Sequence, residues 1–390
     1  MHLPSTPRRL RIRSLSRTWL HSRTPTASRS CSTLCALAVL MLSGCAQESQ
    51  SSPPATDNTS PTKTVSTPAL PTAKLIFKSN FGSGVSLGVP RDYYPNGAWQ
   101  DLLGTDSETG YSWPMTALGT YFSGVQLITV DPITPTTLNN YISNEIRTVP
   151  GPTGSPVREL FQNVKIKAPA GDGGSQAPLM LQRTWNSDVP DLYIAYWFKH
   201  QADLPTSLVH TSAPGSSGHW RVQFEFKTGG AVHPLTGLRY GGGDYRIITS
   251  IMKHTDGHLY WASRGDNNAN RVALDSSGAV IPCPDTTYCP KLTFWSEENH
   301  VVPVPVDRWF RYETYWHRSN GADGRYWVAV DGHVLVDHYG PNMGVDHLPI
   351  TRIMVNNAYS GGNPEVQSQT TGFEIWDGFP CGEGVPCYRP

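Results

Sequence analysis

Apolar and polar residues alternate along much of the second half of this chain. In Trp220–Lys227 every second residue is aromatic or aliphatic, and a polar or charged residue occupies each position between. A β-strand sends successive side chains to opposite faces, so this alternation predicts a half-buried strand. Further strands are predicted by similar segments between turn residues, at 179–185, 191–200, 244–253, 258–264, 307–318, 324–332, 333–339, 350–359 and 372–378.

This pattern predicts the fold class. Many antiparallel strands in one large unit are typical of a sandwich or a jelly roll. The chain contains 36 Gly and 33 Pro, and 10% of its residues are aromatic, which agrees with a chain rich in strands and turns. Residues 95–160 are less periodic, and we expect long loops there with a helical turn or two. We therefore predict a single all-β domain over residues 75–390.

The first 74 residues have a different character. A basic segment from Arg8 to Arg29 precedes the apolar stretch Leu34–Leu42, which is too short to span a bilayer as a helix. This stretch runs into LSGC, Leu42–Cys45, which resembles the lipobox of bacterial lipoproteins. The resemblance implies that residues 1–45 are a signal, cleaved before Cys45, and that its sulfur carries lipid. The alternative is an ordinary signal peptide.

Residues 46–74 are rich in Ser, Thr, Pro and Ala and cannot bury a core, so we predict a disordered tether. Together the two segments predict a lipid-anchored protein of the bacterial cell envelope, at the outer membrane or the cell surface. The protein would then contact a membrane through its lipid anchor.

Four further cysteines bear on the folded part. Export places the protein in an oxidising compartment, where Cys283 with Cys289 and Cys381 with Cys387 are expected to form two local disulfides. Zinc binding by these cysteines is the alternative. No CxxC motif and no His at ligand spacing accompany them, so we expect no metal there.

The charge balance excludes one class of partner. The whole chain has a formal net charge of zero, but residues 1–45 hold seven Arg and no acidic residue. The remaining residues therefore carry 24 Lys and Arg against 31 Asp and Glu. A mildly acidic protein with 16% charged residues has no basic surface for nucleic acid.

We also expect the protein to be a monomer.

Two segments resemble a known fold family. Residues 308–338, RWFRYETYWHRSNGADGRYWVAVDGHVLVDH, resemble a hairpin that is common in concanavalin A-like jelly rolls. Residues 373–381, FEIWDGFPC, resemble the last strand of such domains. Polysaccharide lyases, laminin-G-like modules and lectin-like modules share these features. The resemblance implies a concanavalin A-like jelly-roll sandwich whose concave sheet carries an outward polar row and binds polysaccharide.

The same resemblance suggests where a site would lie. The polar row of residues 221–227 would form the groove floor, together with a second row from residues 307–318. Elimination from a uronate polymer requires groups that neutralise a carboxylate and a base and acid that move protons. The candidate catalytic residues are Arg221, Gln223, Arg246, Tyr315 and His317. The candidate substrate-binding residues are Glu225, Lys227, Arg311, Glu313, Trp295, Asn356 and Asn357.

The catalytic residues of alginate lyases do not carry over, because the motifs QIH and YFKAG are absent. The alternative for the polar rows is cross-strand ion pairing on a solvated face, for example Arg221 with Glu313 or Lys227 with Glu225. Glycoside hydrolysis by Glu225 and Glu313 is another alternative, although the ExDxE signature of laminarinase-like jelly rolls is absent.

We expect no cofactor for any of these possible functions. The oxygen-rich segment RGDNNANR, which contains Asp266, Asn267, Asn268 and Asn270, would suit Ca²⁺, but its spacing is also that of an ordinary turn. Three functions stay open from the sequence. They are a polysaccharide lyase, a non-catalytic glycan-binding surface lipoprotein, and a structural or adhesive envelope protein.

Overall fold

The computed structural model describes residues 73–92, 98–127, 142–165, 178–183, 188–208, 221–232, 239–266, 272–274, 280–282, 293–344, 347–355 and 365–380. Several sequence predictions lie outside these residues: the signal with Cys45, nearly all of the tether, the disulfides of Cys283, Cys289, Cys381 and Cys387, and the residues Asn356 and Asn357. No helix among the described residues is long and apolar enough to cross a membrane.

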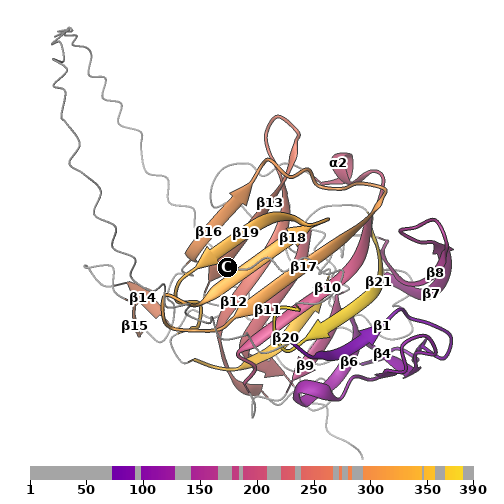
Figure 1. The fold of residues 1–390 in the computed structure, drawn as a ribbon, viewed down its shortest axis with the longest axis horizontal. Helices are drawn as coiled ribbons and strands as arrows, with labels where there is room; N and C mark the ends of the chain where they lie inside the picture. The colour runs from indigo at the N-terminus through magenta and orange to yellow at the C-terminus, as the bar shows by residue number, and fades with distance from the viewer. Residues whose placement is uncertain are drawn as a thin grey trace, which may run out of the picture. The chain divides into compact units, whose positions relative to one another are not determined.

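Two large antiparallel sheets stack face to face (Figure 1). The eight-stranded sheet has the order β19 (His333–Tyr339), β18 (Arg325–Val330), β17 (Trp309–His317), β10 (Asp191–His200), β21 (Val366–Trp376), β8 (Pro156–Val164) and β7 (Ile142–Pro150). Its eighth strand, β1 (Leu75–Ser79), also pairs with β21. This confirms the predicted all-β jelly-roll class.

The eleven-stranded sheet has the order β16 (Thr293–Asn299), β13 (Leu259–Asp266), β12 (Arg239–Lys253), β11 (Arg221–Val232), β20 (Ile350–Val355), β9 (Leu179–Arg183), β6 (Thr120–Leu127), β4 (Ala98–Thr105) and β2 (Ser86–Leu87). The short strands β3 (Arg91–Asp92) and β5 (Ser112–Trp113) also pair with β4. A separate pair joins β14 (Val272–Leu274) to β15 (Val280–Pro282). The described helices are the 3₁₀ turn Ala117–Gly119 and α2 (Leu204–Ser207).

Residues 95–160 differ from the prediction of long loops. They contain β4 to β8, and β7 pairs with β8 from Ile142 opposite Val164 to Pro150 opposite Pro156. The sequence of β7, ISNEIRTVP, has few apolar residues, so its periodicity is weak. Nine cross-strand pairs hold this hairpin. Strand formation depends on such pairing as well as on an apolar face, so a strand with weak alternation is not visible in the sequence pattern.

The core lies between the two sheets. From the eight-stranded sheet, Ile194, Tyr196 and Tyr312 are fully buried there. Phe224 and Ile247 face them from β11 and β12. Strand β17 alternates strictly between buried and partly exposed residues, so Phe310, Tyr312, Thr314 and Trp316 point inward. The other row, Trp309, Arg311, Glu313, Tyr315 and His317, therefore lies on the outer face of the eight-stranded sheet.

Candidate functional site

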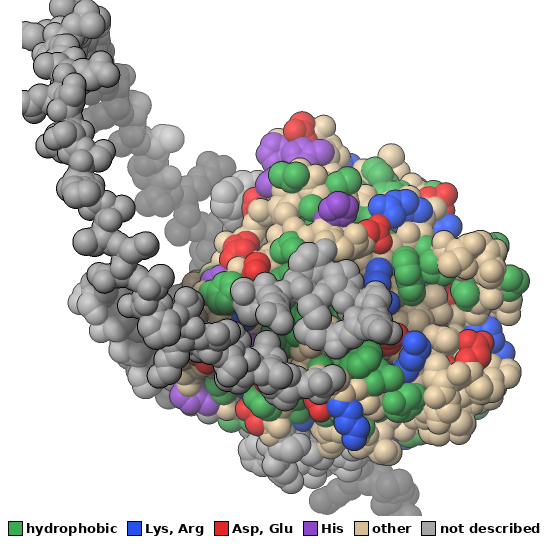
Figure 2. Space-filling view, viewed as in Figure 1, with side chains coloured by type: hydrophobic (Ala, Val, Ile, Leu, Met, Phe, Trp, Pro, Cys, Tyr) green, Lys and Arg blue, Asp and Glu red, His purple; other side chains and the backbone are tan. Residues whose placement is uncertain are grey.

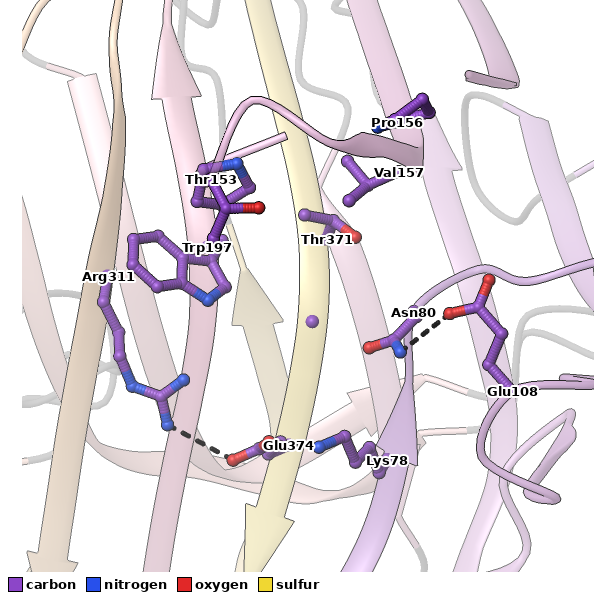
Figure 3. A pocket seen from close by; sticks show the side chains of 12 residues that line it. Lys78, Asn80, Glu108, Thr153, Pro156, Val157, Trp197, Arg311, Thr371 and Glu374 are labelled. Atoms are coloured by element: carbon purple, nitrogen blue, oxygen red, sulfur yellow. Dashed lines mark hydrogen bonds and ion pairs between the residues drawn. The ribbon is translucent and has the colours of Figure 1, made fainter. Parts of the chain in front are cut away.

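A pocket of about 260 Å³ opens on the outer face of the eight-stranded sheet. Trp197 of β10, Arg311 of β17 and Glu374 of β21 form its floor and walls, and Lys78 of β1 closes one side (Figure 3). The turn between β7 and β8 overhangs it through Thr153. The remaining lining residues are Asn80, Glu108, Pro152, Pro156, Val157, Thr371 and Gly372.

Strand register explains why these side chains meet. Ala195 of β10 lies opposite Glu313 on one side and opposite Glu374 on the other. Because Ala195 carries only a methyl group, the long side chain of Arg311 can cross above it. Its guanidinium lies 3.2 Å from a Glu374 carboxylate oxygen and 3.7 Å from a Glu313 oxygen. Lys78 approaches Glu374 from the opposite side at 2.9 Å.

The charges of this pocket hold one another ionised. Burial raises the pKa of Glu374, but hydrogen bonding from Lys78 and the charge of Arg311 outweigh it, and the pKa lies below its ordinary value. Burial lowers the pKa of Arg311, but its interactions with Tyr193, Glu374 and Glu313 raise it by more than burial lowers it. Arg311 therefore stays a cation. A carboxylate held in this way is not a proton donor at neutral pH. Glu374 is therefore not the protonated acid that glycoside hydrolysis needs.

A bulge in β21 shapes the wall beside Trp197. The pairing of β10 with β21 shifts between Ala195 and Trp197, and Gly372 adopts a φ of +59° at this point. A Cβ on residue 372 would lie 3.0 Å from Cδ1 of Trp197. Glycine is therefore required twice, for the left-handed backbone and for the close approach of the indole.

A second cluster lies further along the same face. Tyr315 and His317 of β17 both contact Asp191 of β10, which accepts a hydrogen bond from the Tyr315 hydroxyl and lies 2.8 Å from His317 Nδ1. Burial, followed by the bond to Asp191, raises the pKa of Tyr315, so this phenol keeps its proton at neutral pH. Arg325, opposite His317 on β18, is held by Asp337 at 2.7 and 3.0 Å.

Aromatic side chains connect the pocket to this second cluster. The ring of Phe379 packs against Tyr193 at 5.3 Å, Tyr315 at 5.3 Å and Trp327 at 5.0 Å between centroids. The Tyr193 hydroxyl donates a hydrogen bond to Glu313. Burial, followed by the Glu313 charge, raises the pKa of Tyr193. Basic, acidic and apolar side chains are intermixed on this side of the protein (Figure 2).

Four of the residues that the sequence singled out lie along the outer face of β17: Arg311, Glu313, Tyr315 and His317. The structure does not join them to the row of residues 221–227. Strand β11 belongs to the eleven-stranded sheet and β17 to the eight-stranded sheet. The expectation that both rows form one groove floor is therefore wrong. A local alternation tells which residues share a face, but sheet pairing decides which faces meet.

Arg221 and Gln223 do not lie on an outer face. The register of β11 shifts between Val222 and Phe224, and a bulge of this kind interrupts the alternation of side chains. Gln223 donates to the buried hydroxyl of Tyr196 at 3.2 Å. Arg221 donates to the carbonyl of Gln367 at 2.6 Å, and burial lowers its pKa to about 9. Neither side chain can reach the row on β17.

Glu225, Lys227 and Arg246 form an ion network in the eleven-stranded sheet. Lys227 and Arg246 lie 3.2 and 3.3 Å from Glu225. The predicted pair of Lys227 with Glu225 is thus present, but both residues belong to β11 and Glu225 is buried, so the pair is neither cross-strand nor on a solvated face. Arg246 also pairs with Asp266, whose carboxylate accepts from Arg264 as well. Asp266 is thus engaged by arginines, while the neighbouring Asn267, Asn268 and Asn270 lie outside the described residues. Glu225 and Glu313 occupy different sheets and are not a hydrolase pair.

Trp295 is another predicted contact that lies elsewhere. It sits on β16, at the edge of the eleven-stranded sheet, and stacks on His338 with centroids 4.2 Å apart. Its indole N–H donates to Tyr245 at 2.8 Å. The side chain is partly buried against the core and belongs to a different sheet from β17, so it does not join the row of β17.

Four residues of this face were missed from the sequence: Lys78, Asp191, Tyr193 and Glu374. Glu374 stands between two apolar residues in FEIW, so a signal was present for it. LIFKS begins with three apolar residues and does not alternate, so Lys78 had no such signal. Asp191 and Tyr193 lie in the predicted strand 191–200. Only the pairing of β10 with β17 shows that they approach Glu313, Tyr315 and His317.

No protein-family model and no curated protein matches this chain. Similar solved structures include an endo-β-1,4-glucuronan lyase from the fungus Trichoderma reesei, with 12% identity, 60% of this chain and 90% of that chain covered, and a TM-score of 0.39. An alginate lyase from a Chlorella virus has 12% identity, 64% and 99% coverage and a TM-score of 0.35. The binding domain of a botulinum neurotoxin, serotype D/C, has 6% identity, 75% and 49% coverage and a TM-score of 0.31. Similarity at this level assigns neither an activity nor a residue.

Proposed function

We propose that the protein binds a polysaccharide along the outer face of the eight-stranded sheet. The observation that carries this proposal is the pocket in which the Trp197 indole lies beside Arg311, Lys78 and Glu374. Sugar rings present C–H groups that pack on an aromatic plane. Their hydroxyl groups need donors and acceptors in fixed positions, and the Lys78–Glu374–Arg311 network supplies both.

The extent of this face supports a polymer rather than a single sugar. Arg311 and His317 are six residues apart on β17, a distance of about 20 Å at the rise of a strand. Between them lie Glu313 and Tyr315, which are partly exposed, while the neighbouring Tyr193 and Trp327 are buried beneath Phe379. A row of polar groups of this length offers several successive contacts to a chain of sugar units.

Retention of the full-length protein on immobilised polysaccharide tests the proposal. We expect immobilised acidic or neutral polysaccharides to retain the wild type, and Arg311→Ala to weaken retention at least tenfold because it loses a donor and frees Glu374 and Glu313. The matched control is Arg308→Ala, since Arg308 is exposed and pairs with Asp331 outside the pocket. If the polysaccharides retain both arginine variants as strongly as the wild type, the pocket is not the binding site.

A second candidate function is β-elimination from a uronate polymer. The pair of His317 and Asp191 is the observation that favours it, because a carboxylate at Nδ1 orients an imidazole. In this reaction a base takes the proton at C5, a C4–C5 double bond forms, and the glycosidic oxygen leaves C4 with a proton from an acid. His317 would be the base, and Tyr315, which keeps its proton, would be the acid.

Binding stands first because the cations and the base occupy opposite ends of the row. Arg311 and Lys78 would neutralise a uronate carboxylate, but Arg311 lies about 20 Å along β17 from His317. Arg325, nearer to His317, is engaged by Asp337.

Ultraviolet absorbance of the unsaturated uronate product decides between the two functions. If the protein is a lyase, absorbance rises with at least one uronate polymer, and His317→Ala lowers the rate at least a hundredfold. His333→Ala, an exposed histidine on β19, keeps the full rate. A rate that His317→Ala leaves unchanged excludes the assigned base, and the absence of any rise excludes elimination.

A further inference from the structure

Histidines and carboxylates gather at the turn that joins β12 to β13. This turn has the sequence HTDGH and carries His254, Asp256 and His258. Glu298 and His300, from the end of β16, lie beside it. Figure 2 shows the histidine side chains clustered with an acidic side chain at the top of the view. Nothing in the proposed polysaccharide face involves these residues.

The backbone holds the three side chains of the turn on one side. His254 and His258 are joined by a hydrogen bond from the His254 N–H to the His258 carbonyl at 2.9 Å. The Gly257 N–H donates to the His254 carbonyl at 2.9 Å, and Gly257 adopts a φ of +96°. Asp256 accepts from the His258 N–H at 3.0 Å. The turn is therefore closed by its own bonds and presents its side chains in advance of any ligand.

The spacing of the side-chain atoms suits a metal ion. One ligand atom from each of His254, Asp256 and His258 lies within 4.8 Å of the others. His254 Nδ1 and Asp256 Oδ1 are 3.3 Å apart. Two ligands bonded to a tetrahedral zinc ion at about 2.0–2.1 Å are separated by about 3.3 Å. His258 Nδ1 lies 2.6 Å from Asp256 Oδ1, a hydrogen bond that a metal ion would replace with only a small opening.

The other nitrogen of His258 continues into a relay. His258 Nε2 lies 3.0 Å from His300 Nδ1, and His300 Nε2 lies 3.1 Å from Glu298 Oε2. When His258 Nδ1 is a ligand, Nε2–H donates to His300, and His300 donates to Glu298, so each ring needs a single proton. Stacking on Tyr260 at 4.3 Å orients the His300 ring. Metal-bound histidines commonly donate their second N–H in this way, which increases their basicity.

We propose that His254, Asp256 and His258 bind one divalent transition-metal ion, zinc in the first instance, with His300 and Glu298 as positioning residues. Two imidazole nitrogens and one carboxylate oxygen are ligands that zinc prefers. The three side chains are 49%, 61% and 41% exposed, so an ion reaches them directly from solvent. Three protein ligands leave a fourth tetrahedral position for water or another ligand.

Titration of the full chain with zinc tests this site. We expect one bound zinc to be lost, or its affinity to fall at least tenfold, in His258→Ala and in Asp256→Asn. His300→Ala is expected to weaken binding about tenfold, since it removes only the relay. His333→Ala, an exposed histidine on β19, is the matched control and binds as the wild type does.

Cobalt(II) distinguishes this site from cysteine ligation elsewhere in the chain. A nitrogen and oxygen site gives visible d–d bands without the strong near-ultraviolet band of thiolate ligation, and these bands should disappear in His258→Ala. The proposal is overturned if the wild type binds no zinc, or if His258→Ala and Asp256→Asn keep the wild-type stoichiometry and affinity. Neither result bears on polysaccharide binding.

Discussion

His200, at the end of β10, illustrates how burial controls a single titratable residue. Its side chain packs between Phe198 at 4.7 Å and Phe310 at 5.3 Å, and neither ring nitrogen has a hydrogen-bond partner among the described residues. Burial, followed by the charge of Arg221, lowers its pKa well below the ordinary value of 6.5. The folded protein therefore keeps this imidazole neutral.

This burial predicts a loss of stability in acid. Below pH 6.5 the unfolded chain takes up a proton at His200 that the folded protein refuses, so the free energy of unfolding decreases as pH falls. From pH 7 to pH 5 the expected loss is at most about 2 kcal/mol. Urea unfolding measures the free energy of unfolding at both pH values. The difference between the two values should be smaller in His200→Leu than in the wild type by this amount. An unchanged difference would show that His200 is protonated in the folded state, and His333→Leu serves as the exposed control.

Single residues also show why the site could be predicted only in part. Both faces of 309–317 are aromatic, so its alternation alone leaves open whether Tyr315 or Trp316 faces the core. The resemblance placed Arg311, Glu313, Tyr315 and His317 among the candidate site residues, and burial puts their row on the outer face. Glu374 stood between apolar residues in FEIW, but nothing local indicates that Arg311 approaches Glu374 across β10.

At the scale of elements, the two bulges decide where side chains point. In β21 the bulge at Gly372 brings Thr371 opposite Trp197 and lets the indole line the pocket. In β11 the bulge beside Val222 is accompanied by inward placement of Gln223, against the strict alternation of the sequence. A bulge adds one residue on one strand, and the sequence of that strand does not show which partner it will meet.

The bulge of β21 predicts the effect of a small substitution. Gly372→Ala should destabilise the protein by more than the roughly 1–2 kcal/mol of a left-handed alanine, because the added Cβ presses on Trp197. It should also weaken polysaccharide retention. Gly110→Ala is a matched control, since Gly110 has a φ of +77° and nothing within 4 Å of its Cβ position. Equal unfolding free energies for the two variants would contradict the proposed contact.

At the scale of the whole molecule, the polar groups are divided between two sheets. The network of Glu225, Lys227, Arg246 and Asp266 belongs to the eleven-stranded sheet, while Arg311 and Glu374 lie on the outer face of the other. Burial raises the pKa of Glu225, but Lys227 and Arg246 outweigh it and keep the pKa below its ordinary value. The network thus keeps a nearly inaccessible carboxylate charged.

A substitution in this network should change the stability of the protein without changing its binding to polysaccharide. Arg246→Gln leaves Glu225 and Asp266 with fewer partners, and we expect a loss of about 3 kcal/mol in the free energy of unfolding. Retention on polysaccharide should stay at the wild-type level in the folded variant. A selective loss of retention, with stability unchanged, would assign Arg246 to the binding site after all.

The sequence by itself determined that this chain is an all-β protein, because strands half-buried in a sandwich require a period of two along each segment. It also placed Arg311, Glu313, Tyr315 and His317 on one face of a strand, and it still predicts the lipobox at Cys45 and the two disulfides. Only the tertiary structure decided that β11 and β17 lie in different sheets and that Asp191, Lys78 and Glu374 meet the row of β17. It also placed His300 beside the HTDGH turn. Each of these contacts joins residues far apart in the chain, and pairing between distant strands depends on the packing of the whole sandwich rather than on any local pattern.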